Sequence, residues 1–281
     1  MARLRSTCCV HEAGGAKGAG TSVVGRLIHR AGQLGAGVLA VLLPSRCVCC
    51  AAALPQDVAP VCATCRSRLP RLNPPHCKRC QVTRRLDLPG MDGCAACAEW
   101  PDSLAGAAAP FYMTGVASRV VHALKYEGST ALVDWMAGSM EPSTRRLLAG
   151  RKPVLVPIPM SKARLRERGY NQAGLLAESL ARIAGWGTCL LLQRSQTSRA
   201  QATLTRSERA ENVAGSVSVI PPAVLLARQS RSRAQPEDRA SLLLVDDVLT
   251  TGSTAGACAG ALAAAGFSCV GVVTFARAVP E

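Results

Sequence analysis

Aromatic residues are scarce in this chain: phenylalanine, tryptophan and tyrosine together make up 3% of its 281 residues. Apolar residues still reach 48%, so a core must be built mainly from leucine, valine and alanine. Long apolar runs are also lacking. The stretch Leu34–Leu43 has only ten residues, short of the roughly 18 that a transmembrane helix needs, and the sequence therefore predicts no membrane span.

Two phosphate-binding signatures are absent. No G-x-x-x-x-G-K-[ST] segment occurs, which excludes a P-loop NTPase, and no G-x-G-x-x-G follows an apolar run, which argues against a dinucleotide-binding fold. The four histidines are scattered and form no catalytic motif. We therefore expect a chemistry that needs no histidine constellation.

Acidic residues are in the minority, with 18 against 33 basic ones, and the formal net charge is +15. This excess favours an anionic partner such as a nucleotide, a phosphosugar or a nucleic acid. The basic residues are spread along the chain, which weakens the case for a dedicated nucleic-acid surface.

The most informative segment present reads LLLVDDVLTTGST, at 242–254. Leu242–Val245 is short, apolar and branched, as expected of a buried strand. Asp246 and Asp247 would lie at its carboxyl end, where open α/β sheets bind ligands. The Ala-rich stretch 255–265 should form a helix, and Thr250–Thr254 would wrap the N-terminus of that helix.

This loop suits a phosphate group. Backbone N–H groups converge at a helix N-terminus, hydroxyls add donors, and the helix dipole favours an anion. Gly252 suits a backbone that approaches a phosphate closely or adopts positive φ. A simpler interpretation is a turn in which Ser253 or Thr254 caps the helix. Because a cap needs only one side chain, that interpretation leaves the two acids unexplained, and the segment predicts a sugar-phosphate site.

Eight of the 14 cysteines form four C-x-x-C pairs, separated by 11 to 13 residues. Each pair offers two thiolates, and two pairs make one tetrahedral Cys₄ zinc site. The spacing predicts two structural zinc ions, bound by successive pairs. The predicted ligands are Cys47, Cys50, Cys62, Cys65, Cys77, Cys80, Cys94 and Cys97.

Two other interpretations of the cysteine pairs compete with zinc. A disulfide scaffold would require export, for which the chain has no convincing signal peptide. A redox C-x-x-C normally occurs singly and near a βαβ unit. The segment is rich in proline and arginine and poor in large apolar residues, so we expect it to need metal in order to fold.

A second apolar run, Val154–Ile158, predicts another buried strand. A basic segment follows it, and leucines then recur at helical spacing, so the predicted order is strand, basic loop and helix. Such a loop could neutralise a diphosphate leaving group, or it could be a solvated charged face. Its candidate binding residues are Lys162, Arg164 and Arg168.

The segment 242–254 closely resembles the phosphoribosyl-diphosphate binding motif of type I phosphoribosyltransferases. The string RERGYNQ at 166–172, the segments 122–128 and 194–213, and the cysteine pairs narrow this similarity. Together they resemble the ComF/GntX family of phosphoribosyltransferase-like proteins, whose members carry an N-terminal cysteine zinc module. The resemblance covers roughly residues 43–277.

The resemblance implies an α/β fold: a type I phosphoribosyltransferase-like parallel sheet flanked by helices, preceded by a small Cys-rich zinc-ribbon-like module. It assigns Asp246 and Asp247 to the ribose hydroxyls and the basic segment to pyrophosphate. Mg²⁺ would be held mainly by substrate oxygens. The implied ligand-binding residues are Val248, Thr250, Thr251, Gly252, Ser253, Thr254, Lys162, Arg164, Arg168 and Arg199.

We expect a disordered extension over 1–22, an apolar helix over 23–46, the zinc module over 47–100 and the phosphoribosyltransferase-like domain over 104–281. Residues 221–240 have the composition of a flexible insertion within that domain.

The segment 194–209 carries four arginines and no clear periodicity. A mobile lid over a site would look like this, and so would a plain surface loop. If it is a lid, Arg199, Gln201 and Arg206 are the candidate ligand contacts.

Two functions remain open. One is an enzyme that transfers the phosphoribosyl group from phosphoribosyl diphosphate to an acceptor such as a base; Tyr170 and Phe275 are the nearest aromatic residues that could stack on it. The other is a non-catalytic nucleic-acid-binding accessory protein for DNA uptake or processing, with single-stranded DNA or a competence-machinery protein as partner. The net charge and the zinc module favour this second function. For both, we expect a cytoplasmic protein.

Overall fold

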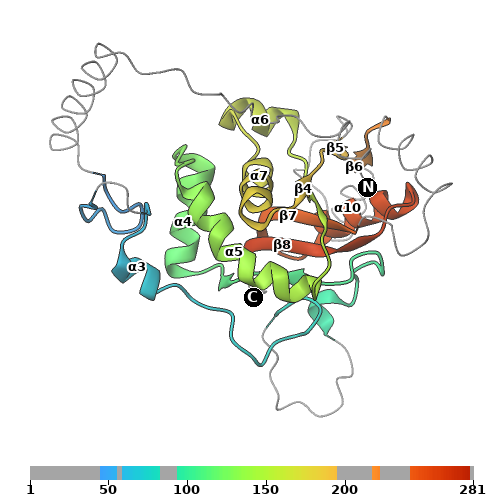
Figure 1. The fold of residues 1–281 in the computed structure, drawn as a ribbon, viewed down its shortest axis with the longest axis horizontal. Helices are drawn as coiled ribbons and strands as arrows, with labels where there is room; N and C mark the ends of the chain where they lie inside the picture. Colours follow the sequence, from blue (N-terminus) through green and yellow to red (C-terminus); the bar gives the residue numbers. More distant parts are fainter. Residues whose placement is uncertain (1–44, 56–58, 83–93, 195–216, 222–240, 279–281) are drawn as a thin grey trace, which may run out of the picture.

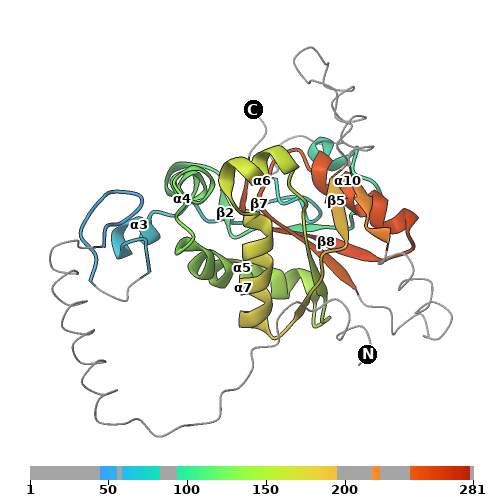
Figure 2. The same ribbon diagram turned by 90° about the horizontal axis from the view of Figure 1, so that it is seen from above.

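The computed structural model describes residues 45–55, 59–82, 94–194, 217–221 and 241–278. Their central feature is a parallel sheet in which the strands lie in the order β1-β8-β7-β3-β4, with β2 also paired to β8. Helices cover both faces of this sheet (Figures 1 and 2). The fold is therefore α/β with a parallel sheet flanked by helices, as the sequence predicted.

The two central strands are β7 (Leu242–Leu249) and β8 (Cys269–Arg277). All nine residues of β8 are buried, which is typical of a parallel strand covered on both faces. The shorter parallel strands are β1 (Ala107–Ala108), β2 (Phe111–Tyr112), β3 (Val154–Pro157) and β4 (Gly187–Thr188). A separate antiparallel pair is formed by β5 (Leu192–Arg194) and β6 (Val217–Val219).

Side chains alternate between the two faces of the sheet and so divide the apolar residues into two cores. Leu243 and Val245 face one core, together with α4 (Gly115–Tyr126), α5 (Leu132–Leu148) and α7 (Gln172–Ala184). Their neighbours Leu242 and Leu244 face the other core, where α10 (Ser253–Ala264) packs. Figure 2 shows α5 and α7 on one side of the sheet and α10 on the other.

The segment 162–168 is a helix, α6 (Lys162–Arg168), and the prediction of a loop there was wrong. Two local signals explain the helix. The Ser161 side chain accepts the N–H of Arg164, with a distance of 3.4 Å, and so caps the N-terminus. Gly169 ends the helix in the left-handed conformation, with a φ of 80°.

The other local predictions hold where the structure describes them. The run Val154–Ile158 forms β3 except for its last residue, and the Ala-rich stretch forms most of α10. The predicted strand Leu242–Val245 continues to Leu249, so the two acids lie within the carboxyl-terminal half of β7.

Three expectations fall outside the described residues. The extension 1–22 lies outside them altogether, and so does the insertion 221–240 beyond its first residue. The apolar helix expected over 23–46 is described only at its last two residues, where Arg46 forms a β-bridge with Ala53.

The two halves of the cysteine-rich region contact different parts of the α/β unit. The first half includes α3 (Ala63–Ser67) and lies beside α4 (Figure 1). There Arg119 of α4 donates to the Cys49 carbonyl, with a distance of 2.6 Å. The second half includes the short helix η1 (Ala95–Cys97) and bonds to the ends of β7 and β8. Each half therefore has its own contact surface on the sheet domain.

Candidate functional site

The acid pair lies at the carboxyl end of β7, on the wall of a cavity of about 540 Å³. Asp247 is buried, and Asp246 is half-buried. Asp246 Oδ1 accepts the backbone N–H of Asp247, with a distance of 2.8 Å. Both carboxylates line the cavity, so the position predicted from the sequence is the one that the sheet provides.

The predicted phosphate loop adjoins the acid pair. Gly252 has a φ of 88°, as expected for its role, and directly precedes α10. The side-chain oxygens of Thr251 and Ser253 lie 2.9 Å apart, and Thr251 Oγ1 accepts the Ser253 N–H. Gly252 has no side chain with which to cap α10, and Thr250 and Thr254 line the cavity with it. The loop thus presents N–H groups and hydroxyls beside the acids.

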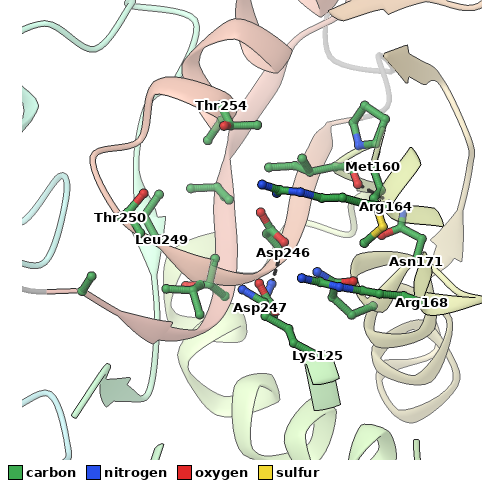
Figure 3. Close-up of a pocket in the computed structure, with 18 of the residues that line it drawn as sticks. Lys125, Met160, Arg164, Arg168, Asn171, Asp246, Asp247, Leu249, Thr250 and Thr254 are labelled. Atoms are coloured by element: carbon green, nitrogen blue, oxygen red, sulfur yellow. Dashed lines mark hydrogen bonds and ion pairs between the residues drawn. The ribbon is translucent and has the colours of Figure 1, made fainter. Parts of the chain in front are cut away.

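Basic side chains from α6 face the acids across the cavity. Figure 3 shows Arg164 and Arg168 reaching from α6 toward Asp246 and Asp247. They bring positive charge opposite the carboxylates and leave room between for a ligand with both hydroxyl and phosphate groups.

Lys125 of α4 is a site residue that the sequence analysis did not single out. Its Nζ lies 3.0 Å from Asp247 Oδ2, and the Lys125 and Asp247 side chains are 22% and 3% exposed. Only the segment around it, 122–128, had been noted for its similarity to a family. The contact joins residues more than a hundred positions apart, so local sequence patterns could not reveal it.

Two buried oxygens in the cavity wall have no hydrogen-bond partner among the described residues. They are Asp247 Oδ2, which has the Lys125 ion pair alone, and Gln172 Oε1 at the start of α7. A buried acceptor without a donor is costly. Both atoms are enclosed, and of the two only Asp247 Oδ2 has a cation beside it.

The pKa of Asp246 is changed by its burial and by its place beside Asp247. Burial and then the neighbouring charge of Asp247 raise the pKa of Asp246 from its usual 3.8 to about 8, although Lys125 opposes the shift. Such shifts are concentrated at functional sites, where charged groups are gathered for chemistry or binding.

The eight predicted cysteine ligands form two separate groups. Within each group the four sulfur atoms lie within 4.8 Å of one another. Neighbouring sulfurs are 3.7 Å apart for Cys50 and Cys62, and 3.6 Å apart for Cys80 and Cys94. A ZnS₄ tetrahedron with Zn–S bonds of about 2.3 Å has edges of about 3.8 Å. Each group therefore fits one structural zinc ion, and successive pairs share a site, as the spacing predicted.

The first cysteine cluster consists of Cys47, Cys50, Cys62 and Cys65, and the second of Cys77, Cys80, Cys94 and Cys97. Each contains one thiol whose pKa is lowered. For Cys47, burial raises the pKa, but hydrogen bonds led by that of the Cys62 N–H outweigh it and lower the pKa to about 6. For Cys77, burial also raises the pKa, but hydrogen bonds led by that of the Cys80 N–H outweigh it and lower the pKa to about 7. Thiolates form most readily at these two sulfurs, which suits metal binding.

Several predicted ligand-binding residues line the cavity and others do not. The cavity wall includes Val248, Thr250, Gly252, Thr254, Arg164 and Arg168. Lys162 belongs to α6 but is not part of the wall, and the exposed Thr251 and Ser253 contribute to the loop rather than to the wall. Arg199 and the other residues of the expected lid lie outside the described residues, except Arg194, which is in the wall.

The aromatic residues expected to stack on a base are not available for it. Phe275 is fully buried in β8, and Tyr170 donates its hydroxyl to the Leu124 carbonyl. Tyr126, at the end of α4, lines the cavity instead and is 64% exposed. The Arg168 guanidinium lies 4.9 Å from the centre of its ring. An aromatic face is thus present at the cavity rim, at a residue that the sequence analysis missed.

The fold is a parallel sheet flanked by helices, with an acid pair and an N–H-rich loop at the end of a central strand. Over 130 residues the chain is 26% identical to competence protein ComFC of Bacillus subtilis (strain 168). The match covers 46% of each protein, so the chain spans about half the length of this relative. The chain is thus similar over part of its length to a ComF protein, and it also carries two cysteine clusters.

A second comparison is structural. A hypoxanthine phosphoribosyltransferase from Staphylococcus aureus aligns with 53% of this chain and 73% of its own, at 10% identity and a TM-score of 0.28. No family model matches the chain. Within the part of the chain that the structure describes, no helix is both long and apolar enough to cross a membrane.

The cysteine geometry predicts two zinc ions per chain. Replacing one ligand in each cluster in turn, Cys50→Ser and Cys94→Ser, should lower the zinc content from two ions to one, because a structural site needs all four ligands. Zinc is measured by mass spectrometry of the purified, dialysed protein. Cys49→Ser is the matched control, since Cys49 lies beside the first cluster but does not belong to it. Two ions in all three variants would contradict the assignment.

The raised pKa of Asp246 predicts a pH-dependent stability. A carboxyl group whose pKa is raised by folding stabilises the fold at low pH, and this contribution is lost as pH rises from about 4 toward 8. Asp246→Asn has no such loss. We expect similar Tm values below pH 4 and, at pH 9, a Tm for the variant that is higher by at least ~2–4 °C, the change that about 1 kcal/mol gives a domain of this size.

Asp134→Asn is the control for this experiment, with the opposite sign. A hydrogen bond from Ser179, and then Arg182, lowers the pKa of Asp134, so its carboxylate stabilises the fold at high pH. This variant should not gain stability as pH rises. A difference between wild type and Asp246→Asn that stays constant with pH would contradict the raised pKa.

Proposed function

We propose that the cavity binds a ribose phosphate, and that Mg²⁺-phosphoribosyl diphosphate is the ligand that uses all of its groups. One observation carries the proposal. The acid pair and the phosphate loop share one wall of the cavity, while Arg164 and Arg168 face them from the opposite side (Figure 3). Acceptors for the ribose hydroxyls, N–H donors for the 5-phosphate and cations for the diphosphate thus occupy different parts of the cavity. The ligand carries these three groups at different positions.

The ribose hydroxyls are assigned to the acids. A hydroxyl donates one hydrogen bond, and the carboxylate oxygens of Asp246 and Asp247 accept it. A hydrogen bond to a charged acceptor contributes about 1.5–3 kcal/mol, so two such contacts would dominate ribose recognition.

The 5-phosphate is assigned to the loop 250–254. The first N–H groups of α10 have no partner within their own helix and point toward its N-terminal end. The hydroxyls of Thr250 and Thr254 lie on the same wall. Together they offer the donors that a phosphate dianion requires.

The diphosphate is assigned to the basic side of the cavity. Arg164 and Arg168 can each bind two phosphate oxygens at once, because a guanidinium presents donors in a planar fork. Lys125 also lines the cavity and is paired with Asp247. It can balance the charge of Asp247 before the ligand binds and contact the diphosphate afterwards.

If the protein is an enzyme, these contacts suit phosphoribosyl transfer. An acceptor nitrogen forms a bond to the anomeric carbon while the bond from that carbon to the diphosphate oxygen breaks, and the electron pair leaves with pyrophosphate. Arginine side chains aimed at the leaving group stabilise the charge that develops on it. Mg²⁺, held mainly by substrate oxygens, would neutralise part of that charge.

The proposal predicts the outcome of titration calorimetry with Mg²⁺-phosphoribosyl diphosphate. The variant Asp246→Asn/Asp247→Asn keeps the shape of both side chains but removes both carboxyl groups. Loss of one or more charged hydrogen bonds should weaken binding at least roughly tenfold.

Asp134→Asn is the matched control, because Asp134 is a carboxylate of α5 outside the cavity. It should bind within about twofold of wild type. No binding by a folded, zinc-loaded wild type would reject the proposal. Equal affinity in wild type and the double variant would reject the assignment of the acids.

A second candidate function rests on Tyr126. An exposed ring beside Arg168 and Arg164 combines stacking and positive charge, which is how proteins bind single-stranded nucleic acid without base-specific contacts. The relative named as a competence protein makes a role in DNA handling a reasonable alternative for this chain. This function does not require transfer chemistry.

The second candidate is tested with a fluorescent oligothymidine and anisotropy measurements. Tyr126→Ala should weaken binding by at least fivefold, because stacking of one base contributes about 1–3 kcal/mol. Leu190→Ala is the control, since Leu190 is equally exposed and lies outside the cavity wall. Binding that is unchanged in Tyr126→Ala, or absent in wild type, would exclude Tyr126 as a nucleic-acid contact.

A further inference from the structure

The second cysteine cluster is connected to the phosphate loop by a tryptophan. Trp100, three residues after the last cysteine of that cluster, donates from Nε1 to the Thr251 carbonyl, with a distance of 2.8 Å. Trp100 is only 7% exposed. This hydrogen bond holds the loop against the indole, because breaking it would leave the N–H of a buried side chain without a partner.

The loop is also fitted to the indole ring. A Cβ atom at Gly252 would overlap the ring of Trp100, and one at Gly256 would lie 3.1 Å from Pro101 Cδ. Glycine at these two positions therefore lets the loop and the first turn of α10 lie directly against the segment 100–101.

The position of Trp100 follows from the cluster itself. The backbone N–H of Trp100 donates to the Cys97 carbonyl, with a distance of 3.2 Å. Arg79, between Cys77 and Cys80, donates to the carbonyls of Cys97 and Trp100, both at 3.3 Å. Metal bound by the four sulfurs would fix the backbone at Cys77 and Cys80, which flank Arg79, and at Cys97, to which Trp100 is bonded. The indole of Trp100 would be fixed with them.

Arg277 makes a second connection. It is 1% exposed, and its Nε donates to the Cys80 carbonyl, with a distance of 2.9 Å. Its Nη1 donates to the carbonyls of Leu249 and Thr250, at the point where β7 passes into the loop. One guanidinium thus ties a cysteine of the second cluster to the start of the phosphate loop.

We propose that metal bound at the second cysteine cluster sets the conformation of the phosphate loop through Trp100 and Arg277, so that ligand binding in the cavity depends on this cluster and not on the first. Trp100 and Arg277 are positioning residues in this proposal. The part that concerns ligand binding rests on the proposed function, whereas the part that concerns loop conformation does not.

The first cluster offers the internal comparison. It contacts α4 through the bond from Arg119 to Cys49, and its buried residues share a core with that helix. Arg119 lies near the start of that helix, and Lys125 lies near its end. Between them Val120, Val121 and Leu124 are fully buried and hold the helix on the core. Loss of metal from the first cluster should therefore leave the cavity in place.

The test compares Cys94→Ser with Cys50→Ser. Each replaces the most exposed cysteine of its cluster. Hydrogen–deuterium exchange of the backbone amides at 250–256 is the first readout, and it needs no ligand. Exchange at these amides should rise about tenfold in Cys94→Ser and stay within twofold of wild type in Cys50→Ser. An equal rise in both variants, or in neither, would overturn the proposal.

Trp100→Phe tests the connection while the cluster keeps all four sulfurs. It removes the N–H donor but keeps an aromatic ring. Zinc content should remain at the wild-type level, exchange at 250–256 should rise, and affinity for Mg²⁺-phosphoribosyl diphosphate should fall about tenfold. Trp186→Phe is the control, because Trp186 lies against Arg145 and outside the cavity wall. Unchanged exchange in Trp100→Phe with intact zinc would reject Trp100 as a positioning residue.

A spectroscopic readout separates positioning from general stability. In the background Trp135→Phe/Trp186→Phe, Trp100 is the single tryptophan of the chain. Its emission should shift on addition of Mg²⁺-phosphoribosyl diphosphate, and also when a chelator removes zinc. If wild type binds no ligand, the proposed function fails, but the chelator shift and the exchange data still decide whether the second cluster positions the loop.

Discussion

The geometry of the site depends on the contacts of one buried guanidinium, that of Arg277. Arg277 ends the most buried strand of the sheet, where burial lowers its pKa and the sulfurs of the second cysteine cluster oppose that effect. A charge in such a place needs hydrogen-bond partners and compensating charge. Carbonyls from Cys80, Leu249 and Thr250 accept from Nε and Nη1, whereas the buried Nη2 has no hydrogen-bond partner among the described residues. Four thiolates around one Zn²⁺ carry net negative charge and would supply the compensating charge. The end of β7, the end of β8 and the cluster are therefore held as one unit.

The acid pair poses the opposite problem, since two like charges share the end of β7. Lys125 balances one of them at 3.0 Å, while the other carboxyl group has its pKa raised to about 8. Neither adjustment is needed for folding alone, because apolar side chains at the same positions would bury at lower cost. The cost of burying these two carboxyl groups would be offset once ligand hydroxyls donate to the acids and ligand phosphates approach Arg164 and Arg168. The acids and the arginines would then both have partners.

The parts that could be predicted from the sequence are those set by near neighbours in the chain. The strand, loop and helix of 242–264 follow one another directly, and the cysteine clusters use successive pairs. The parts that could not are long-range contacts. Trp100 meets Thr251 across 151 residues, and no local pattern predicts such a pairing. The helix α6 was missed for a different reason: its cap at Ser161 and its terminating Gly169 were present, but the density of basic side chains favoured a loop.

The two candidate functions are not independent, because they share Arg168. Its guanidinium lies over the ring of Tyr126 and also lines the cavity. A diphosphate in the cavity would compete for the same donors, since a bidentate phosphate contact is stronger than an exposed cation–π contact. Occupation of the cavity would then draw the guanidinium away from the ring and leave the aromatic face without its cation. If both proposals hold, a phosphosugar in the pocket would weaken the binding of nucleic acid without contacting it.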